Sequence, residues 1–267
     1  MKKFNKIFTV LVYIFLYAPI LILIVFSFNS TKSTIDFTGF TLKWYRELFT
    51  RPDLLKLLMN TLIIAVIASV VSTVLGTMAA VGISSMKRRS RSMVLTATNI
   101  PMTNPDIVTG VSLALLFVFA GTFLRINDVF GFWTLLIAHI TFCLPYVILS
   151  VLPKIKQMDK NLTDAALDLG CTPTQSFFKI MLPEILPGII SGATMAFTLS
   201  LDDFVISYFV YGASFSTLHI EIYSYTKKPM PPTVFVLFTI MFTVIFLLLF
   251  FMNMAEYKKS KKKKIDL

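Results

Sequence analysis

Three acidic residues lie inside long apolar runs of this 267-residue chain, where a carboxylate can bind a cation or carry a proton. They are Asp106, Asp202 and Asp203, and no Lys or Arg shares an apolar run with them. Charged side chains in the bilayer core are costly, so they usually face a cavity, a partner or a transported species. Because no internal Lys or Arg neutralises these acids, the sequence predicts a pathway for a cationic cargo.

Polyamines fit this arrangement well, because their ammonium groups are spaced along a flexible chain. Phe204, Tyr208 and Tyr211 could add cation–π contacts, although aromatic side chains at such positions also serve plain packing. His139 is the only histidine within the apolar runs. We expect it to be a hydrogen-bonded packing residue rather than a functional one.

Local structure offers each acid an alternative role. Asn104, Pro105 and Asp106 fit the cap and the first two positions of a helix, where an acid is favourable without any cargo. Asp202 and Asp203 are adjacent, so on a helix their side chains point about 100° apart. One of the two would touch the cargo, while the other bonds to another subunit or stays protonated.

The elements that carry these residues are apolar segments long enough to cross a membrane. Hydrophobic residues make up 56% of the chain, against about 45–50% in soluble proteins. A transmembrane helix needs about 20 apolar residues. The sequence therefore predicts an all-α polytopic membrane protein with six transmembrane helices: Ile7–Phe28, Leu57–Met86, Met93–Ala120, Trp133–Leu152, Gly188–Val210 and Thr233–Met254.

Basic residues are distributed unevenly over the loops between these runs. If alternate loops are cytoplasmic, 17 of the 25 Lys and Arg residues lie on that side. This bias follows the positive-inside rule with both termini in the cytoplasm. It explains the net charge of +11 without nucleic acid, and we interpret the lysine-rich tail as an anchor to anionic lipid. The cytoplasmic basic residues are Lys2, Lys3, Lys6, Lys87, Arg88, Arg89, Arg91, Lys154, Lys156, Lys160, Lys179 and the six lysines from Lys258 to Lys264.

Prolines interrupt the third run. Pro101 and Pro105 remove backbone donors near its middle and are expected to kink the helix. Broken helices at membrane depth survive only where they are buried in protein or line a cavity. They recur at transport sites, so the break indicates a place where the pathway and the third helix meet.

The segment between the fourth and fifth runs, Pro153–Pro187, has the pattern of two short helices at a bend. Asn161 can cap the first helix, with Asp164 in its first turn. Gly170 supplies the left-handed residue that ends it. A second short helix is expected to begin at Thr172.

Two small residues, Ala165 and Ala166, are expected on the surface of this bend. Small side chains let the backbone of a partner approach closely, which favours a docking element. An ordinary amphipathic loop at the membrane surface is the alternative interpretation.

This loop resembles the EAA loop of ABC importer permeases, whose pattern is Glu-Ala-Ala, three residues, Gly, nine residues, Ile, one residue and Leu-Pro. Every spacing is kept, and Asp replaces Glu at the first position, which preserves the charge and shortens the reach. The resemblance implies a type I ABC importer permease fold and a coupling helix that docks in a cleft of a separate ATPase subunit. The matching residues are Asp164, Ala165, Ala166, Gly170, Ile180, Leu182 and Pro183.

Further segments, spread over nearly the whole chain, resemble the second permease subunits of spermidine/putrescine importers. Permeases for iron, thiamine or phosphonate share parts of the pattern and remain alternatives. The resemblance implies a multi-pass protein of the bacterial cell membrane with a sister permease, two ATPase subunits and an extracytoplasmic polyamine-binding protein as partners. The segments are Leu42–Phe49, Asn60–Thr61, Pro105–Val108 and Ser200–Phe204.

The chain lacks the sequence signature of an ATPase. None of its ten glycines is followed by Lys, so it has no phosphate-binding loop of the Gly-Lys-Ser/Thr type. We therefore expect no enzyme activity and no cofactor on this chain, with ATP and Mg²⁺ held by the partner ATPase. Two other classes compete. A proton-coupled secondary transporter would not need the coupling-loop spacing, and a structural scaffold would not need unpaired acids in the membrane.

Three parts of the chain follow from these segments. Residues 1–56 hold the first transmembrane helix and an outer loop, and the first apolar run is longer than a signal-peptide core, so we expect it to stay. Residues 57–254 form the permease core, with the coupling loop at 153–187. Residues 255–267 form a basic cytoplasmic tail.

Overall fold

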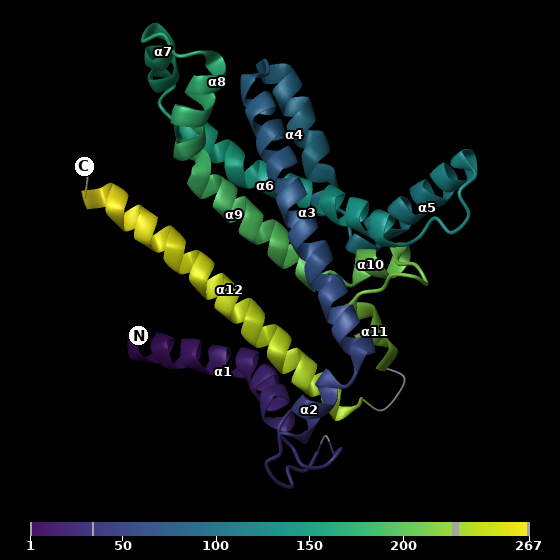
Figure 1. Ribbon diagram of the computed structural model, residues 1–267. Coiled ribbons are helices and arrows are strands. Elements are labelled where there is room, and N and C mark those ends of the chain that lie inside the picture. The colour runs from purple at the N-terminus through teal and green to yellow at the C-terminus, as the bar shows by residue number, and fades with distance from the viewer. Residues whose placement is uncertain (1, 34, 226–229, 266–267) are drawn as a thin grey trace. The chain divides into compact units, whose positions relative to one another are not determined.

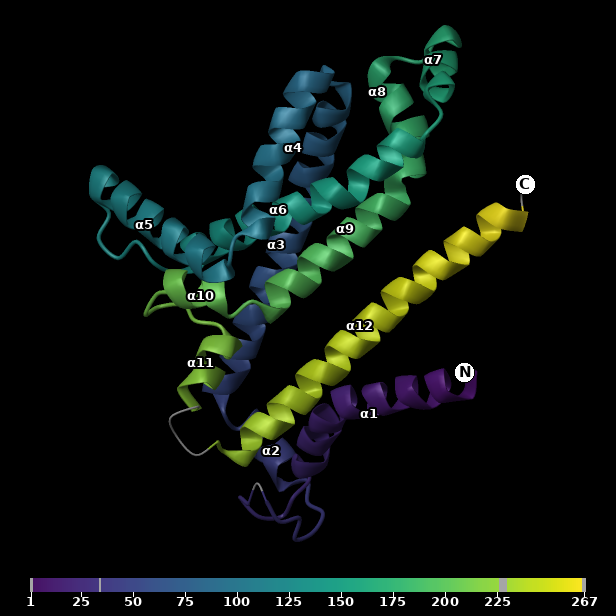
Figure 2. The same cartoon turned by 180° about the vertical axis from the view of Figure 1, so that it is seen from behind.

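The computed structural model is built almost entirely of helices (Figures 1 and 2). Within the described ranges, β-structure is limited to two isolated bridges. In chain order the elements are α1 (Lys2–Phe26), α2 (Lys43–Phe49), α3 (Pro52–Ser85), α4 (Arg88–Thr103), α5 (Asp106–Leu124), α6 (Phe132–Gln157), α7 (Lys160–Asp168), α8 (Pro173–Ser176), the π-helix η1 (Phe177–Met181), α9 (Leu182–Asp202), α10 (Val205–Val210), α11 (Leu218–Ser224) and α12 (Pro232–Ile265). The structure describes residues 2–33, 35–225 and 230–265, and it describes their side chains except at 2–5, 160, 248–249, 251–253 and 255–265.

Five helices among the described residues are long and apolar enough to cross a membrane. The sixth predicted run, Thr233–Met254, lies on α12, where the described apolar stretch Pro232–Leu247 is shorter. The all-α polytopic fold is therefore confirmed, while the sixth span remains a prediction. The predicted basic tail, 255–267, lies outside the residues whose side chains are described. The five candidate spans are Lys6–Phe26, Pro52–Ser85, Asp106–Leu124, Phe132–Gln157 and Pro173–Asp202.

One compact unit combines the chain up to Lys56 with Ile222–Met254 and contains α1, α2 and most of α12. The most apolar part of α1 has no buried residue, and a helix that is apolar on every side is typical of a membrane span. The loop after α1 is closed by Trp44 on α2, whose indole N–H donates a hydrogen bond to the Asn29 carbonyl at 2.7 Å. In this unit, a candidate membrane helix is thus joined to a hydrogen-bonded loop.

The other compact unit comprises Leu57–Glu221 and the last residues of the chain. Its centre is α6, which packs along α9. Small residues allow this close contact, because a side chain at Gly188 would lie 2.9 Å from the Ser150 carbonyl oxygen and one at Gly192 would lie 3.3 Å from the Val147 Cα. The short helix α10 packs against both α5 and α6, and α6 also contacts α5 and α9, which carry Asp106 and Asp202.

The third predicted run is broken, as expected, and the break divides it into two separate helices. α4 ends at Thr103, α5 begins at Asp106, and Figure 1 shows the two leaving the break in different directions. Pro105 lacks an N–H and forces an extended backbone on Asn104, which has ψ of 145°. Asn104 therefore ends α4 and does not cap α5, contrary to the prediction. Pro105 occupies the cap position, and Asp106 is the first residue of α5.

The fifth predicted run differs from the structure at both ends. The helix begins earlier, because α8, η1 and α9 form one continuous stretch from Pro173 to Asp202. It also ends earlier, since the backbone is extended at Asp203 and a separate helix, α10, follows. Asp202 and Asp203 thus lie at a helix break, and the assumption of a continuous helix through both is wrong.

Candidate functional site: the coupling loop and the acids beside α6

The predicted coupling loop contains two helices at a bend, as expected, but the second helix continues through η1 into α9 and the cap of the first helix is a different residue. The Asp159 carboxylate accepts a hydrogen bond from the Asn161 N–H at 3.0 Å and caps α7. The prediction that Asn161 is the cap is wrong, because Asp159 precedes the free N–H groups and its short side chain reaches them. Asp164 is the fifth residue of α7 and therefore lies beyond the first turn, which also differs from the prediction.

The end of α7 follows the prediction. Gly170 has φ of 86°, in the left-handed region that glycine enters without a steric penalty. Its N–H donates to the Leu167 carbonyl at 2.9 Å, and the N–H of Cys171 donates to the Ala166 carbonyl at 3.0 Å. These two bonds form a Schellman motif, which ends the helix and turns the chain.

The second short helix also begins where predicted. Thr172 Oγ1 accepts a hydrogen bond from the Gln175 N–H at 3.3 Å, and the Gln175 side chain accepts one from the Thr172 N–H at 3.1 Å. The π-helical turn η1 then connects α8 to α9 just before Pro183, which has no N–H to donate to the preceding turn. Ile180, Leu182 and Pro183 thus lie where η1 continues into α9, inside the fifth candidate span, Pro173–Asp202.

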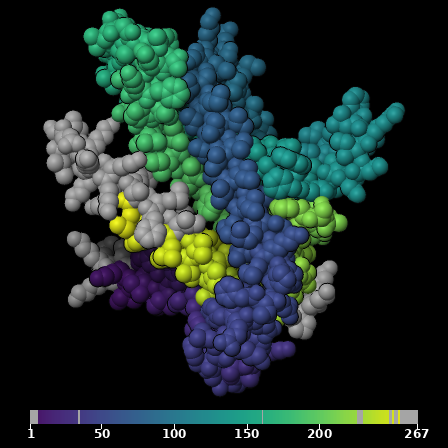
Figure 3. All heavy atoms as spheres, in the orientation of Figure 1, coloured from purple at the N-terminus to yellow at the C-terminus, as the bar shows by residue number. Residues whose placement is uncertain are grey.

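Residues 160–181, which we call the knob, project from one end of their unit, as the green lobe in Figure 3 shows. Ala165 is exposed, as predicted, whereas Ala166 is buried with only 7% of its surface exposed, contrary to the prediction. Adjacent helical residues point about 100° apart, so one of the two turns inward. The exposed apolar residues of the knob lie on more than one side of α7, and we group them under the name docking patch: Leu162, Ala165, Leu167, Leu169 and Phe178.

The helix break at Asp203 is closed by the side chain of that residue. Its Oδ1 accepts a hydrogen bond from the Ile206 N–H at 3.1 Å, and its Oδ2 accepts bonds from the Ser207 N–H at 2.8 Å and the Ser207 hydroxyl at 2.7 Å. A helix that starts at membrane depth has free N–H groups that only protein or a lined cavity can satisfy. The Asp203 side chain is 6% exposed, and both of its oxygens already accept hydrogen bonds from this chain.

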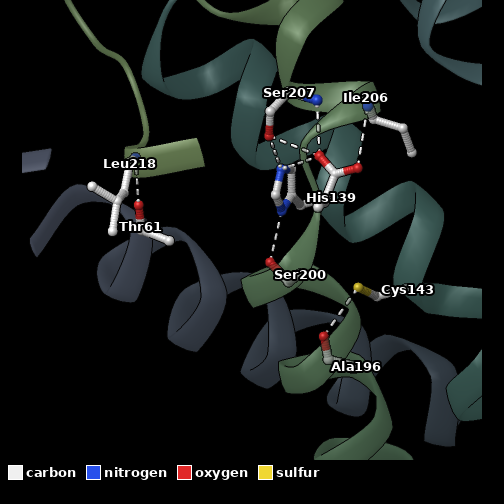
Figure 4. A network of polar contacts seen from close by, with 9 residues as sticks. Thr61, His139, Cys143, Ala196, Ser200, Ile206, Ser207 and Leu218 are labelled. Carbon is white, nitrogen blue, oxygen red and sulfur yellow. Dashed lines mark hydrogen bonds and ion pairs between the residues drawn. The ribbon is translucent and has the colours of Figure 1, made fainter. Parts of the chain in front are cut away.

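His139 on α6 completes the network, as Figure 4 shows. Its Nδ1 shares a hydrogen bond with Ser200 Oγ at 2.7 Å, and its Nε2 lies 2.9 Å from Ser207 Oγ and 3.4 Å from Asp203 Oδ2. The ring is 2% exposed. The expectation of a hydrogen-bonded histidine is confirmed, while its lack of a functional role is not tested. No Lys or Arg shares an apolar run with Asp203, but the imidazole of His139 lies beside it.

Asp202 and Asp106 are exposed, unlike Asp203. Asp202 is the last residue of α9, and Asp106 is the first residue of α5. Both of these helices contact α6, so the two exposed acids lie on elements that border it.

Aromatic side chains stand in a row on and around α10. The ring centroids of Phe204 and Tyr208 are 5.6 Å apart, and those of Tyr208 and Tyr211 are 6.2 Å apart. Tyr208 and Tyr211 are 41% and 38% exposed. Both rings are thus accessible, as a cation–π contact with cargo would require.

His219 on α11 belongs to the same region, although no local sequence pattern singles it out. α11 lies outside the candidate membrane spans. Burial lowers the pKa of His219 and outweighs the carboxylates of Asp202 and Asp203, which act in the opposite direction. Its Nδ1 is buried and has no hydrogen-bond partner within the described part of the chain.

Asn60 and Thr61 on α3 hold the segment that leads into α11. Thr61 Oγ1 accepts a hydrogen bond from the Leu218 N–H at 2.9 Å (Figure 4), and Asn60 Nδ2 donates to the Ser216 carbonyl at 3.0 Å. The bonded residues are 157 and 156 positions apart in the chain. No spacing within the sequence could reveal such contacts.

The membrane helices, the knob and the acids are together typical of one class of protein, the transport permeases. The family described as binding-protein-dependent transport system inner membrane component matches residues 72–258. The chain belongs to this family. It is therefore a multi-pass inner-membrane component of an ABC transport system and not an enzyme.

Within this family, the chain is similar to several individual permeases. The chain is 40% identical over 230 residues to the spermidine/putrescine transport system permease protein PotC of Escherichia coli strain K12, covering 86% of this chain and 85% of that protein. It is 38% identical over 234 residues to PotC of Haemophilus influenzae, with coverages of 88% and 89%. The putrescine transport system permease protein PotI of Escherichia coli strain K12 is 38% identical over 228 residues, covering 85% of this chain and 81% of that protein.

Solved structures support the fold. A bacterial ABC transporter involved in the import of the acidic polysaccharide alginate contains a chain that matches with a TM-score of 0.76 at 15% identity, covering 96% of this chain and 94% of that one. A chain of an amino acid ABC transporter matches with a TM-score of 0.54 at 16% identity, with coverages of 83% and 99%. The ABC importer permease fold is thus confirmed.

Proposed function

We propose that this chain is a permease subunit of an ATP-driven importer for spermidine and putrescine and forms half of its translocation pathway. The observation that carries the proposal is the 38–40% identity, over 85–88% of the chain, to permeases named for these polyamines. The charge inventory supports a cationic cargo, because exposed acids border α6 while the apolar runs contain no Lys or Arg.

Asp202 and Asp106 are the acids that the cargo reaches. Asp202 stands at the carboxyl end of α9, where the negative end of the helix dipole adds to its attraction for an ammonium group. Asp106 offers a second carboxylate at the start of α5. Tyr208 and Tyr211 stack against the cation. Asp203 lies in the wall of the pathway and acts through its neighbours.

The knob transmits the energy of ATP hydrolysis to the pathway. Its docking patch binds in a cleft of an ATPase subunit, with Asp164 at the edge of the contact. Ile180, Leu182 and Pro183 connect the knob to α9, so a movement of the knob also moves the helix that ends at Asp202. An exposed apolar patch on a compact, well-capped element supports this role.

The complete importer contains a sister permease, two ATPase subunits that hold ATP and Mg²⁺, and an extracytoplasmic polyamine-binding protein. In this arrangement the chain has six transmembrane helices and both termini in the cytoplasm. Residues 1–56 form the first helix and outer loop, residues 57–254 form the core with its coupling loop at 153–187, and residues 255–267 anchor the chain to lipid. The chain itself carries no cofactor.

Uptake measurements in cells test the substrate assignment. Deleting the gene should abolish high-affinity uptake of radiolabelled spermidine and putrescine, and a plasmid copy should restore it. Uptake of iron, thiamine and phosphonate, measured in the same cells, should not change. Loss of one of these three with normal polyamine uptake would assign the chain to another importer.

A second measurement separates ATP-driven import from proton coupling. In cells whose proton gradient is collapsed while ATP is maintained, polyamine uptake should continue. If uptake stops under these conditions, the acids serve a proton relay and the chain is not an ATP-driven permease.

A further inference from the structure

α10 is a six-residue helix held at both ends by side chains of α6. At its start, His139 reaches Ser207, and Asp203 caps the free N–H groups. At its end, Thr134 Oγ1 donates to the Val210 carbonyl at 3.2 Å. α5 closes the remaining side, since a Cβ on Gly110 would lie 2.8 Å from the Phe209 ring. α10 therefore has little freedom to change its direction.

His139 also crosses the break itself. One ring nitrogen is bonded to Ser200 in the last turn of α9, and the other approaches Ser207 in α10 and the Asp203 carboxylate between them. One rigid ring thus contacts the helix before the break, the residue in the break and the helix after it. A single side chain thus links α9, the break and α10.

Stability alone does not explain such a network. Replacing a buried ion pair by apolar side chains of similar volume is often neutral or stabilising, whereas buried polar groups can select one geometry among several. The geometry selected here turns Asp203 inward, to 6% exposure, while the residue directly before it, Asp202, is exposed. The network decides which of two adjacent acids faces outward.

We propose that His139 and Asp203 are positioning residues, which fix the α9–α10 break so that the Asp202 carboxylate stays presented to the cargo. The proposal rests on the proposed function in one respect, the use of Asp202 by the cargo. Asp203 holds the break in place and does not contact the cargo, whereas Asp202 binds a cargo ammonium group.

Thiol labelling tests the geometry without any cargo. In the assembled transporter carrying Cys171→Ser, Asp202→Cys should react readily with a cationic methanethiosulfonate reagent. Adding His139→Leu should slow the reaction at least severalfold, and His139→Gln, which keeps a hydrogen-bonding end group, should restore much of it. Asn127→Cys in the exposed α5–α6 loop is the control, and its rate should be the same in all backgrounds. An unchanged Asp202→Cys rate in the His139→Leu protein overturns the proposal.

Uptake per molecule of assembled chain provides the second test. Asp202→Asn and His139→Leu should each reduce polyamine uptake by about tenfold or more, and the double variant should lose no more than Asp202→Asn alone. A multiplied loss in the double variant contradicts positioning and indicates an independent role for His139. If Asp202→Asn leaves uptake normal, the cargo role of Asp202 fails, while the labelling rates still decide the positioning role.

Milder variants cover the case in which His139→Leu does not assemble. Ser200→Ala removes one bond of the ring, and Thr134→Val removes the bond to the end of α10. Both should slow labelling of Asp202→Cys in the same direction as His139→Leu, by a smaller factor. If both variants assemble and label at the full rate, the proposal is wrong.

Discussion

The knob and the α9–α10 break lie at opposite ends of α9, and both are places where a helix terminates, yet they are stabilised differently. In the knob, the caps join residues two or three positions apart, as between Asp159 and Asn161 or Thr172 and Gln175. At the break, the decisive contacts come from His139 on another helix, 61 residues before Ser200. The knob is stabilised by bonds between neighbouring residues and has exposed apolar side chains. The break is stabilised by a side chain from another helix, and its polar groups are buried.

This difference shows how each region works. Exposed apolar residues on a rigid, locally capped element indicate a surface that another protein covers. Buried polar residues with every group bonded indicate a geometry that the chain fixes for itself. A substitution in the docking patch should therefore affect assembly with a partner, and a substitution at the break should affect the pathway.

The largest effect is expected in the docking patch. Ala165→Arg places a long charged side chain where the patch meets the ATPase, so it should abolish polyamine uptake while the chain remains in the membrane at normal amount. Ala165→Ser, which keeps the side chain small, is the matched control and should retain uptake. Measurements are radiolabelled uptake and co-purification of the ATPase. Normal uptake by Ala165→Arg with the ATPase attached would show that the patch does not couple.

Ala166 sharpens this test because it is the adjacent, buried alanine. Ala166→Arg should disturb the packing of the knob itself, and so lower the amount or thermal stability of the chain as well as its uptake. Equal behaviour of the two Arg variants, with normal stability in both, would contradict the distinction between an outward and an inward alanine.

The second largest effect is expected at the exposed acid of the break. Asp202→Asn keeps size and hydrogen bonding but removes the charge. A hydrogen bond between charged groups is worth about 1.5–3 kcal/mol, so uptake should fall by about tenfold to hundredfold if the bond acts on the rate-limiting step. Asp106→Asn should reduce spermidine uptake more than putrescine uptake, because the longer polyamine can reach both acids. Normal uptake in all of these variants, measured with radiolabelled polyamines, would reopen the choice of substrate.

The two regions also differ in how far the sequence predicts them. The knob follows from residue types at fixed local spacing, and its Gly170 turn and Thr172 start are confirmed. The errors there are small and local. Asp159 replaces Asn161 as the cap, since several polar residues near a helix start can reach its N–H groups. Ala166 turns inward, because the inward face of so short a helix depends on what packs beneath it.

At the break, the sequence identified the acids but not their arrangement. The third run contains prolines that mark its division, whereas residues 203–210 contain none. The local signal there is Asp203, which can cap a new helix, but an Asp marks a helix break less clearly than a proline does. The pairing of Asp203 with His139 and the bond from Thr61 to Leu218 join distant positions. Hydropathy predicts that these segments lie in or near the membrane, and only the packed structure brings them together.

Gly170 gives a smaller and purely local effect. With φ of 86° and no neighbouring atom within 4 Å of the place that a Cβ would take, Gly170→Ala meets backbone strain alone. Left-handed geometry costs a residue with a side chain about 1 kcal/mol. Thermal unfolding of the purified importer should show a slightly less stable knob, and uptake should fall a few-fold at most. Gly170→Asn should be milder, since Asn tolerates this geometry better. An uptake loss as large as that of Ala165→Arg would mean that the turn itself contacts the ATPase.

The smallest effect is expected at His219. Unlike His139, whose ring is hydrogen-bonded, His219 should reveal itself in the pH dependence of folding stability. Burial lowers the pKa of His219 in the folded chain, while an unfolded His has a pKa of about 6.5. Below that pH the unfolded chain binds a proton that the folded chain resists, so folding stability should decrease as the pH falls, by at most about 1.4 kcal/mol per pH unit for one group. Thermal unfolding of the assembled importer at pH 7.5 and pH 5.5 should show this loss in the wild type and a smaller loss in His219→Gln. Asp202, Asp203 and His139 face the His219 ring and are present in both proteins, so the difference between the two losses reports the proton uptake of His219 itself. Equal losses in the two proteins would place the acid sensitivity elsewhere, with His139 as the next group to replace.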